Sequence, residues 1–164
     1  MVPYATPEWV EAMAKVYRDN PENQNKTFKG MTLFLAFRIL ANPILGLDRD
    51  IYFGTHIEDG ILQDDSTIIS KHYAEQKADF ILSATPETWK RVIKKQQGFV
   101  SAFMVGKIKL DKGSVPKVIA LAPKSPAVVE CFHQVDTEWP DEMSPQRLEE
   151  YRAYVKEFAA KLGV

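Results

Sequence analysis

Few residues in this chain have the types and spacing that catalysis or metal binding requires. Cys131 is the only cysteine, which excludes an intramolecular disulfide and a zinc site built on cysteines. Cys131 and His133 stand two positions apart, so on a helix their side chains point to different faces. A nucleophile and its base must instead lie within hydrogen-bond contact. We therefore predict no catalytic residues, no metal site, no cofactor and no enzymatic activity.

One group of carboxylates is close together in the sequence, namely Glu58, Asp59, Asp64 and Asp65. These acids surround Asp59-Gly60, a dipeptide that supplies the positive φ angles of a tight hairpin turn. Aspartate is common in turns for conformational reasons alone. We interpret the four as solvated carboxylates at a hairpin tip, and not as metal ligands or catalytic acids.

The charges of the chain are distributed unevenly. The net charge is −1, yet residues 90–124 contain nine bases and a single acid, Asp111. A basic segment in a nearly neutral protein suggests an anionic partner such as a membrane surface. The alternative is a set of separate lysines on solvated faces. No feature of the sequence predicts a nucleic-acid partner.

The length of 164 residues predicts a single domain with a core of its own. The first residues lack the basic start and apolar run of a secretory signal. The longest apolar stretch, 31–47, is interrupted by Arg38, Asn42, Pro43 and Gly46 and is too short to span a membrane. We expect a soluble, cytoplasmic protein.

Four predicted helix starts share one pattern, in which a hydroxyl residue that can cap the helix precedes a proline. They are Thr6-Pro7, Thr85-Pro86, Ser125-Pro126 and Ser144-Pro145. Together with apolar spacing, they predict a first helix over 7–19 and a last helix over 145–162. Between these, we predict a helix that starts at Thr85 and stops near Gly98, and two short helices over 99–105 and 115–121.

Strand signals alternate with these helices. Residues 31–40 are apolar almost throughout, and we interpret them as a buried strand. A hairpin follows, because alternate residues from Ile51 share one face up to the turn at Asp59-Gly60. Residues 78–84 form a short strand, and residues 107–111 alternate basic and apolar as a strand with one buried face.

The region 78–121 resembles the sterol carrier protein type 2 lipid-transfer family. The resemblance rests on an Ala-Asp strand start, a glycine after the next helix, an Ala-Phe…Gly-Lys-Ile-Lys-Leu segment and a glycine turn before an apolar helix. The matching residues are Ala78, Asp79, Gly98, Ala102, Phe103, Gly106, Lys107, Ile108, Lys109, Leu110, Lys112 and Gly113. Strand order extends the similarity back to about residue 28.

This resemblance implies an α+β fold, with an antiparallel sheet of about five strands and helices packed on one face. A hydrophobic tunnel between the two layers would hold a fatty acid, a fatty acyl-CoA or a sterol-like ligand. The lipid-transfer core would cover about 25–122 of the single domain 1–164, between the N-terminal helix 7–19 and a C-terminal helical extension, 123–164.

The candidate tunnel residues follow from the apolar side chains of this region, which exceed what one sheet face normally needs. They are Phe80, Leu82, Trp89, Ile93, Phe99, Ala102, Phe103, Met104 and Val105. Four bases would flank the tunnel and attract an anionic headgroup or membrane surface: Lys90, Arg91, Lys94 and Lys95.

Several alternatives remain open at this stage. Family members often carry glutamine where this chain has Val105, so the resemblance favours a plain acyl chain over a sterol hydroxyl. An accessory protein–protein interaction domain with a filled core is the second function that we consider. The last helix carries one apolar seam, which predicts a lid, a core element or a dimer contact. The seam consists of Leu148, Tyr151, Val155, Phe158 and Leu162.

Overall fold

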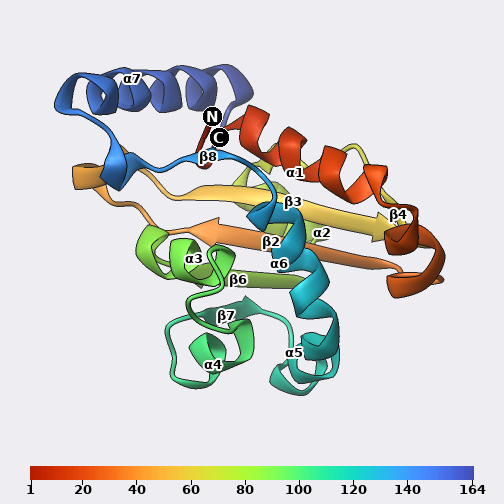
Figure 1. Cartoon of the computed structure of the whole chain (residues 1–164). Helices are drawn as coiled ribbons and strands as arrows, with labels where there is room; N and C mark the ends of the chain where they lie inside the picture. Colours follow the sequence, from red (N-terminus) through yellow and green to blue (C-terminus); the bar gives the residue numbers. More distant parts are fainter.

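The computed structural model describes all 164 residues and contains one main sheet covered by helices (Figure 1). From one edge to the other, its strands are β4 (Ile61–Leu62), β3 (Ile51–Glu58), β2 (Leu33–Ile39), β6 (Phe80–Ala84) and β7 (Lys109–Lys112). A further short strand, β5 (Ile68–Ile69), pairs with β3. A separate two-stranded sheet is formed by β1 (Val2–Pro3) and β8 (Thr137–Glu138), which pair in parallel.

The main sheet is mixed, which corrects the expectation of an antiparallel sheet. β2 is antiparallel to β3, and β6 is antiparallel to β7, but β2 and β6 run parallel. The chain leaves β2, forms β3 to β5 and then α2, and so returns to the same end of the sheet. A crossover of this length is what parallel neighbours require.

The hairpin turn between β3 and β4 is confirmed. Asp59 and Gly60 have φ angles of 50° and 78°, as a two-residue type I′ turn demands. A Cβ at Gly60 would approach the carbonyl oxygen of Gln24 to 2.8 Å, so this glycine is also needed for close packing.

Seven helices surround the sheet (Figure 1). Their bounds are α1 (Pro7–Asp19), α2 (Lys71–Lys77), α3 (Pro86–Ile93), α4 (Phe99–Met104), α5 (Val115–Leu121), α6 (Ser125–His133) and α7 (Pro145–Leu162). Four single turns complete the chain: η1 (Asn23–Thr27), η2 (Pro43–Leu45), η3 (Ala122–Lys124) and η4 (Pro140–Glu142). No helix is both long enough and apolar enough to span a bilayer.

Helices cover both faces of the sheet, although we expected them on one. Side chains alternate along a strand, so Phe37 of β2 faces the core shared with α1, α3 and α6, whereas Ala36 faces the other side. There, Ala74 of α2 packs with Ala36 and Tyr52 in a smaller apolar cluster. The helix α2 was missed because six of its seven residues are polar or aromatic and only Ala74 is buried.

Three of the four predicted hydroxyl caps are confirmed. Thr6, Thr85 and Ser144 each accept a hydrogen bond from the backbone N–H three residues ahead. Ser125 does not, because α6 continues directly from η3 and its hydroxyl donates to the carbonyl of Ala122 instead. Its proline still occupies the first turn of a helix.

Gly98 starts a helix and does not end one. The helix α3 stops at Ile93, and Lys95 takes the left-handed conformation with φ 61°, so the chain has already turned before the glycine. Gly98 is the N-cap of α4. After α4, the backbone N–H groups of Lys107 and Ile108 both bond to the carbonyl of Ala102, which delays the start of β7.

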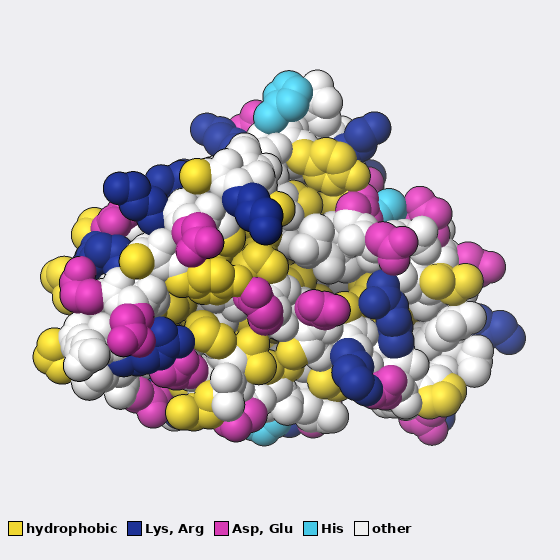
Figure 2. All heavy atoms as spheres, turned by 90° about the horizontal axis from the view of Figure 1, so that it is seen from above, with side chains coloured by type: hydrophobic (Ala, Val, Ile, Leu, Met, Phe, Trp, Pro, Cys, Tyr) yellow, Lys and Arg dark blue, Asp and Glu magenta, His cyan; other side chains and the backbone are white.

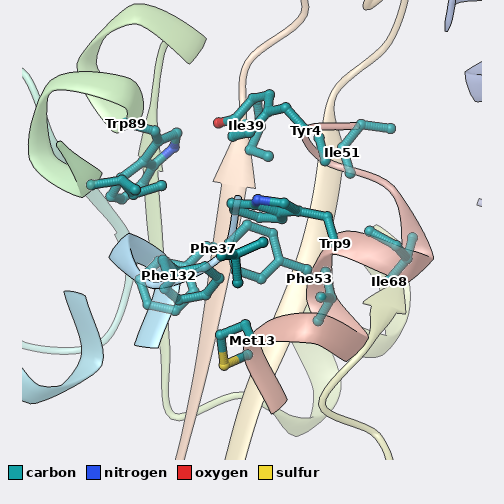
Figure 3. Packing of buried hydrophobic residues seen from close by; sticks show 14 of the residues in the cluster. Tyr4, Trp9, Met13, Phe37, Ile39, Ile51, Phe53, Ile68, Trp89 and Phe132 are labelled. Carbon is teal, nitrogen blue, oxygen red and sulfur yellow. The ribbon is translucent and has the colours of Figure 1, made fainter. Parts of the chain in front are cut away.

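The core is densest where α1 and α6 cross the sheet (Figure 3). The ring of Trp9 meets Phe53 at 5.5 Å and Phe132 at 5.0 Å, and Phe37 stacks on Phe53 at 5.1 Å between ring centres. The indole N–H of Trp9 donates to the hydroxyl of Thr137 at 3.0 Å. The first helix is thereby fixed to both the sheet and the C-terminal segment.

The last helix is part of this single structure. Tyr151, Val155 and Phe158 of α7 are buried in the main core. The hydroxyl of Tyr151 donates to the backbone carbonyl of Tyr4, beside the β1–β8 pair. Three of the five seam residues are therefore covered from within the chain, whereas Leu148 is half-buried and Leu162 is exposed.

Candidate functional site

An apolar cavity lies between the sheet and the helices α3 to α6. Its free volume is about 80 Å³, and 18 of its 20 lining residues are hydrophobic. The lining consists of Tyr4, Trp9, Phe28, Leu33, Leu35, Phe37, Phe53, Phe80, Leu82, Trp89, Val92, Ile93, Phe99, Val118, Leu121, Lys124, Ser125, Val128, Val129 and Phe132. Such a space favours an apolar ligand.

The alternation of side chains along the central strands builds the floor of this cavity. Leu33, Leu35 and Phe37 occupy every second position of β2 and face the helices. Phe80 and Leu82 do the same on β6, which pairs with β2 in the register Leu35–Phe80. The helices add the roof, and their half-buried residues, such as Phe99 and Leu121, mark where it is thinnest.

The structure places the nine predicted tunnel residues in two groups. Five of them line the cavity: Phe80, Leu82, Trp89, Ile93 and Phe99. The other four do not line it: Ala102, Phe103, Met104 and Val105. Ala102 is fully buried in the core beside the cavity, and Phe103 is half-buried and stacks on Phe99. Met104 and Val105 are 67% and 64% exposed, because they end α4 on its outer side.

Sequence reasoning missed much of the roof. Val118 and Leu121 come from α5, and Val128, Val129 and Phe132 come from α6. A signal for α6 was present in the Ser125-Pro126 start followed by apolar residues at helical spacing. Tyr4 and Trp9, at the other end of the cavity, are brought there by tertiary packing that no local pattern encodes.

One polar group in the lining has no hydrogen-bond partner. The indole N–H of Trp89 donates to the carbonyl of Arg38 at 3.1 Å, and Lys124 and Ser125 donate to backbone carbonyls. The hydroxyl of Tyr4, fully buried, meets neither donor nor acceptor. Figure 3 shows it directed toward Trp89. Burial and the nearby Tyr151 raise the pKa of Tyr4, so its hydroxyl stays protonated.

The four bases that we predicted to face an anionic partner are paired within the chain. Lys90 lies 2.8 Å from Asp141 and 2.7 Å from Glu142, and it also lies over the ring of Trp139. Three further pairs complete the set: Arg91 with Glu87, Lys94 with Glu142, and Lys95 with Glu130. Four bases thus meet four acids, and little positive charge is left over at this helix.

Neither Cys131 nor His133 is arranged for catalysis. Burial, followed by the charge of Glu130, raises the pKa of the Cys131 thiol to about 11, which leaves it protonated and a weak nucleophile at neutral pH. The imidazole Nδ1 of His133 lies 2.9 Å from the carbonyl oxygen of Ile93. No group of three His, Cys, Asp or Glu residues is arranged to hold a metal ion.

The carboxylates near the hairpin are not all solvated, which corrects the sequence interpretation for Asp65. One of its oxygens lies 2.7 Å from Nδ1 of His56, and the other accepts a hydrogen bond of 2.7 Å from the hydroxyl of Tyr73. The ring of His56 also stacks on Phe34. Because Tyr73 lies on α2 and His56 on β3, this cluster ties α2 to the sheet. None of these residues lines the apolar cavity.

Three solved structures share this fold. A crystal structure of sterol carrier protein 2 matches with a TM-score of 0.70 at 21% identity, over 80% of this chain and 98% of that one. A conserved hypothetical protein from Thermus thermophilus, described as possibly a sterol carrier protein, matches with 0.71 at 20% identity, over 84% and 93%. Sterol carrier protein 2 from Yarrowia lipolytica, in its apo form, matches with 0.51 at 15% identity, over 77% and 90%.

No protein-family profile matches the chain, and no curated protein matches it. At these identities, the structural similarity establishes the fold. The chain has the sterol carrier protein 2 fold, as the motifs of region 78–121 predicted. Its apolar cavity lies between the layers of that fold.

Proposed function

We propose that the protein binds a single apolar lipid ligand, a fatty acyl chain or a sterol-like molecule, in this cavity and transfers it between membranes. The observation that carries the proposal is the cavity itself, with 18 hydrophobic residues among 20 and no charged group other than Lys124. Each methylene buried there contributes about 0.8 kcal/mol. A long chain would therefore bind without any specific polar contact.

The cavity must enlarge to hold such a ligand. Its free volume of about 80 Å³ is well below the range of roughly 300–1,000 Å³ that is usual for ligand sites. The extra space is easiest to gain under α4 and α5, since both helices are short and neither start has a side-chain cap. Outward movement of these helices would separate Phe99 and Leu121 from the cluster around Phe80.

Polar groups at the two ends of the cavity suggest how the ligand lies. Lys124 and Ser125 are half-buried and stand where α5 gives way to α6, so a carboxylate or headgroup would remain near them. The unpaired Tyr4 hydroxyl lies at the other end. It would donate a hydrogen bond to a neutral oxygen on the ligand, such as the hydroxyl oxygen of a sterol-like molecule, and would recover the cost of its burial.

Titration with a fluorescent fatty acid, in solution and without vesicles, tests the proposal. The wild type should bind saturably with micromolar or better affinity. Val118→Phe, at a buried lining position, should weaken binding by about tenfold, because the added ring occupies the space of roughly two ligand methylenes. The control is Val16→Phe on α1, a half-buried position outside the cavity lining, and it should bind like the wild type.

Two results would contradict the proposal. One is the absence of saturable binding of any acyl chain or sterol-like probe by the wild type. The other is equal binding by Val118→Phe and the wild type, provided that circular dichroism shows both to be folded.

The second candidate function, an accessory interaction domain with a filled core, is favoured by one observation. The cavity is small in the unliganded chain, as a domain that binds no ligand would show. Such a domain would take up no probe, whereas a carrier would expand around it. The same titration therefore separates the two functions.

A further inference from the structure

The end of the molecule formed by α4 and α5 exposes an unusual amount of apolar surface. Nine large hydrophobic residues of the chain are exposed, and five of them fall within 100–119. They are Val100 (44%), Met104 (67%), Val105 (64%), Val115 (48%) and Ile119 (50%). We call these five, together with Lys107 and Lys117, the tip surface. Figure 1 shows α4 and α5 together at the lower end, far from α7 and the termini.

Each of these two helices has apolar residues both on the face turned to the core and on the face turned outward. In α4, Phe99 and Phe103 turn toward the cluster around Phe80, while Val100 and Met104, four residues apart, face outward. In α5, Val118 faces inward, and Val115 and Ile119 face outward with the same spacing. A helix that is apolar all round is normally buried. Here the outer faces have no cover from the chain.

The charge at this end is of one sign. The helix α4 has no charged residue, α5 has only Lys117, and the turn between α4 and β7 adds the exposed Lys107. The single acid of residues 99–121 is Asp111, and it is bound to Arg38 and Ser83 on β2 and β6. The face seen from above, by contrast, mixes bases and acids (Figure 2).

We infer that the tip surface docks on an anionic lipid bilayer. Aliphatic side chains can enter the boundary between headgroups and acyl chains, and lysines beside them are attracted to anionic headgroups. A second copy of the chain is a poorer occupant, since a two-fold contact would bring Lys107 and Lys117 of one copy toward the same lysines of the other. The surface also borders the thinnest part of the cavity roof, at Phe99 and Leu121.

This inference places membrane contact at α4 and α5, and not at the helix α3, whose bases are neutralised by neighbouring acids. Docking depends on the proposed function only for its purpose, which would be to let a lipid pass between the bilayer and the cavity. Docking is measured here without any added ligand. Failure of docking and failure of lipid binding are therefore separate results.

Flotation with vesicles tests the inference. The full chain should float with vesicles of phosphatidylcholine and phosphatidylserine in a ratio of about 7:3 at low salt, and should stay behind with pure phosphatidylcholine. Met104→Ser with Ile119→Ser, and separately Lys107→Gln with Lys117→Gln, should each lower the bound fraction by about tenfold. The matched control is Ile44→Ser on η2, which removes a side chain that is 83% exposed elsewhere, and it should float like the wild type.

Three results would overturn the inference. The first is that the wild type floats with neither kind of vesicle. The second is that both double variants float as well as the wild type while remaining folded by circular dichroism. The third is a concentration-dependent dimer in sedimentation that Met104→Ser with Ile119→Ser dissociates, since the tip surface would then join two copies. An acidic protein as the true partner would give the first result.

Discussion

The two ends of the space between sheet and helices are built differently. At the α1–α6 end, Trp9, Phe53 and Phe132 interlock and are at most 5% exposed, and the N–H of Trp9 is bonded to Thr137. At the α4–α5 end, Phe99 and Phe103 of α4 are only half-buried, and both α4 and α5 are short helices without a side-chain cap. One end is a close-packed core, and the other is a loosely attached roof.

This difference assigns separate tasks to the two ends. Close packing resists displacement, because each lost contact forfeits attraction that nothing replaces. A region with few buried contacts opens at a lower free energy. The α1–α6 end therefore holds the floor and the Tyr4 end of the cavity in place, while under the proposed function a ligand would enter and leave at the α4–α5 end. The same roof also carries the exposed tip surface.

The largest expected effect is a difference in the free energy of unfolding lost by substitutions at the α1–α6 end and at the α4–α5 end. Trp9→Ala should lower the free energy of unfolding by about 3–5 kcal/mol, because it leaves a cavity among rigid neighbours. Phe103→Ala should lower it by less than half as much, since Phe103 is half-buried and the roof can collapse. Urea denaturation followed by tryptophan fluorescence and circular dichroism measures both. Equal losses in the two variants would remove the distinction between core and roof.

The next largest effect tests the role of Tyr4 at its end of the cavity. Tyr4→Phe should weaken binding of a sterol-like probe by about tenfold, the value of one hydrogen bond to a buried hydroxyl. Binding of a plain fatty acid should not change, because its carboxylate would stay near Lys124. The unfolding free energy should stay level or rise slightly, since an unpaired polar group is removed. Equal loss for both probes would show that Tyr4 only shapes the cavity.

Local patterns predicted much of the fold. The turn at Asp59-Gly60, the cap at Thr6, the strand around Phe37 and the helices α5 and α7 all follow from neighbours within a few residues. The parallel pairing of β2 with β6 could not be derived in this way. It depends on how residues 40–79 return across the sheet, and no local period records that path.

The candidate site was predicted less completely, for the same reason. Apolar side chains such as Leu82 and Met104 look alike in sequence, yet tertiary packing leaves Leu82 buried in the main core and Met104 67% exposed. The basic stretch misled in a similar way. The acids that neutralise Lys90 are Asp141 and Glu142, about fifty residues further along the chain. Charge counted by segment cannot include such partners.

The smallest effect concerns the connection between α3 and α4. Gly98 has an ordinary φ of −71°, and an added Cβ would meet nothing within 4 Å. Gly98→Ala should therefore change the free energy of unfolding by less than about 1 kcal/mol, because the lower freedom of the unfolded chain is offset by the poorer N-cap that alanine gives to α4. Gly113→Ala is the contrasting variant, because its Cβ would lie 2.5 Å from Phe80 at φ 111° and should destabilise the roof. Equal losses of stability in Gly98→Ala and Gly113→Ala, measured by urea denaturation, would contradict this view of the roof.

Native mass spectrometry of the protein purified from its own host without detergent tests most directly whether an apolar lipid occupies the cavity. We predict a population heavier than the bare chain by the mass of one lipid, with a stoichiometry of one per chain. Removal and re-addition of that lipid should restore the heavier species in the wild type and much less of it in Val118→Phe. Recovery of the bare chain alone, together with no uptake of any acyl chain or sterol-like molecule on re-addition, would contradict the account.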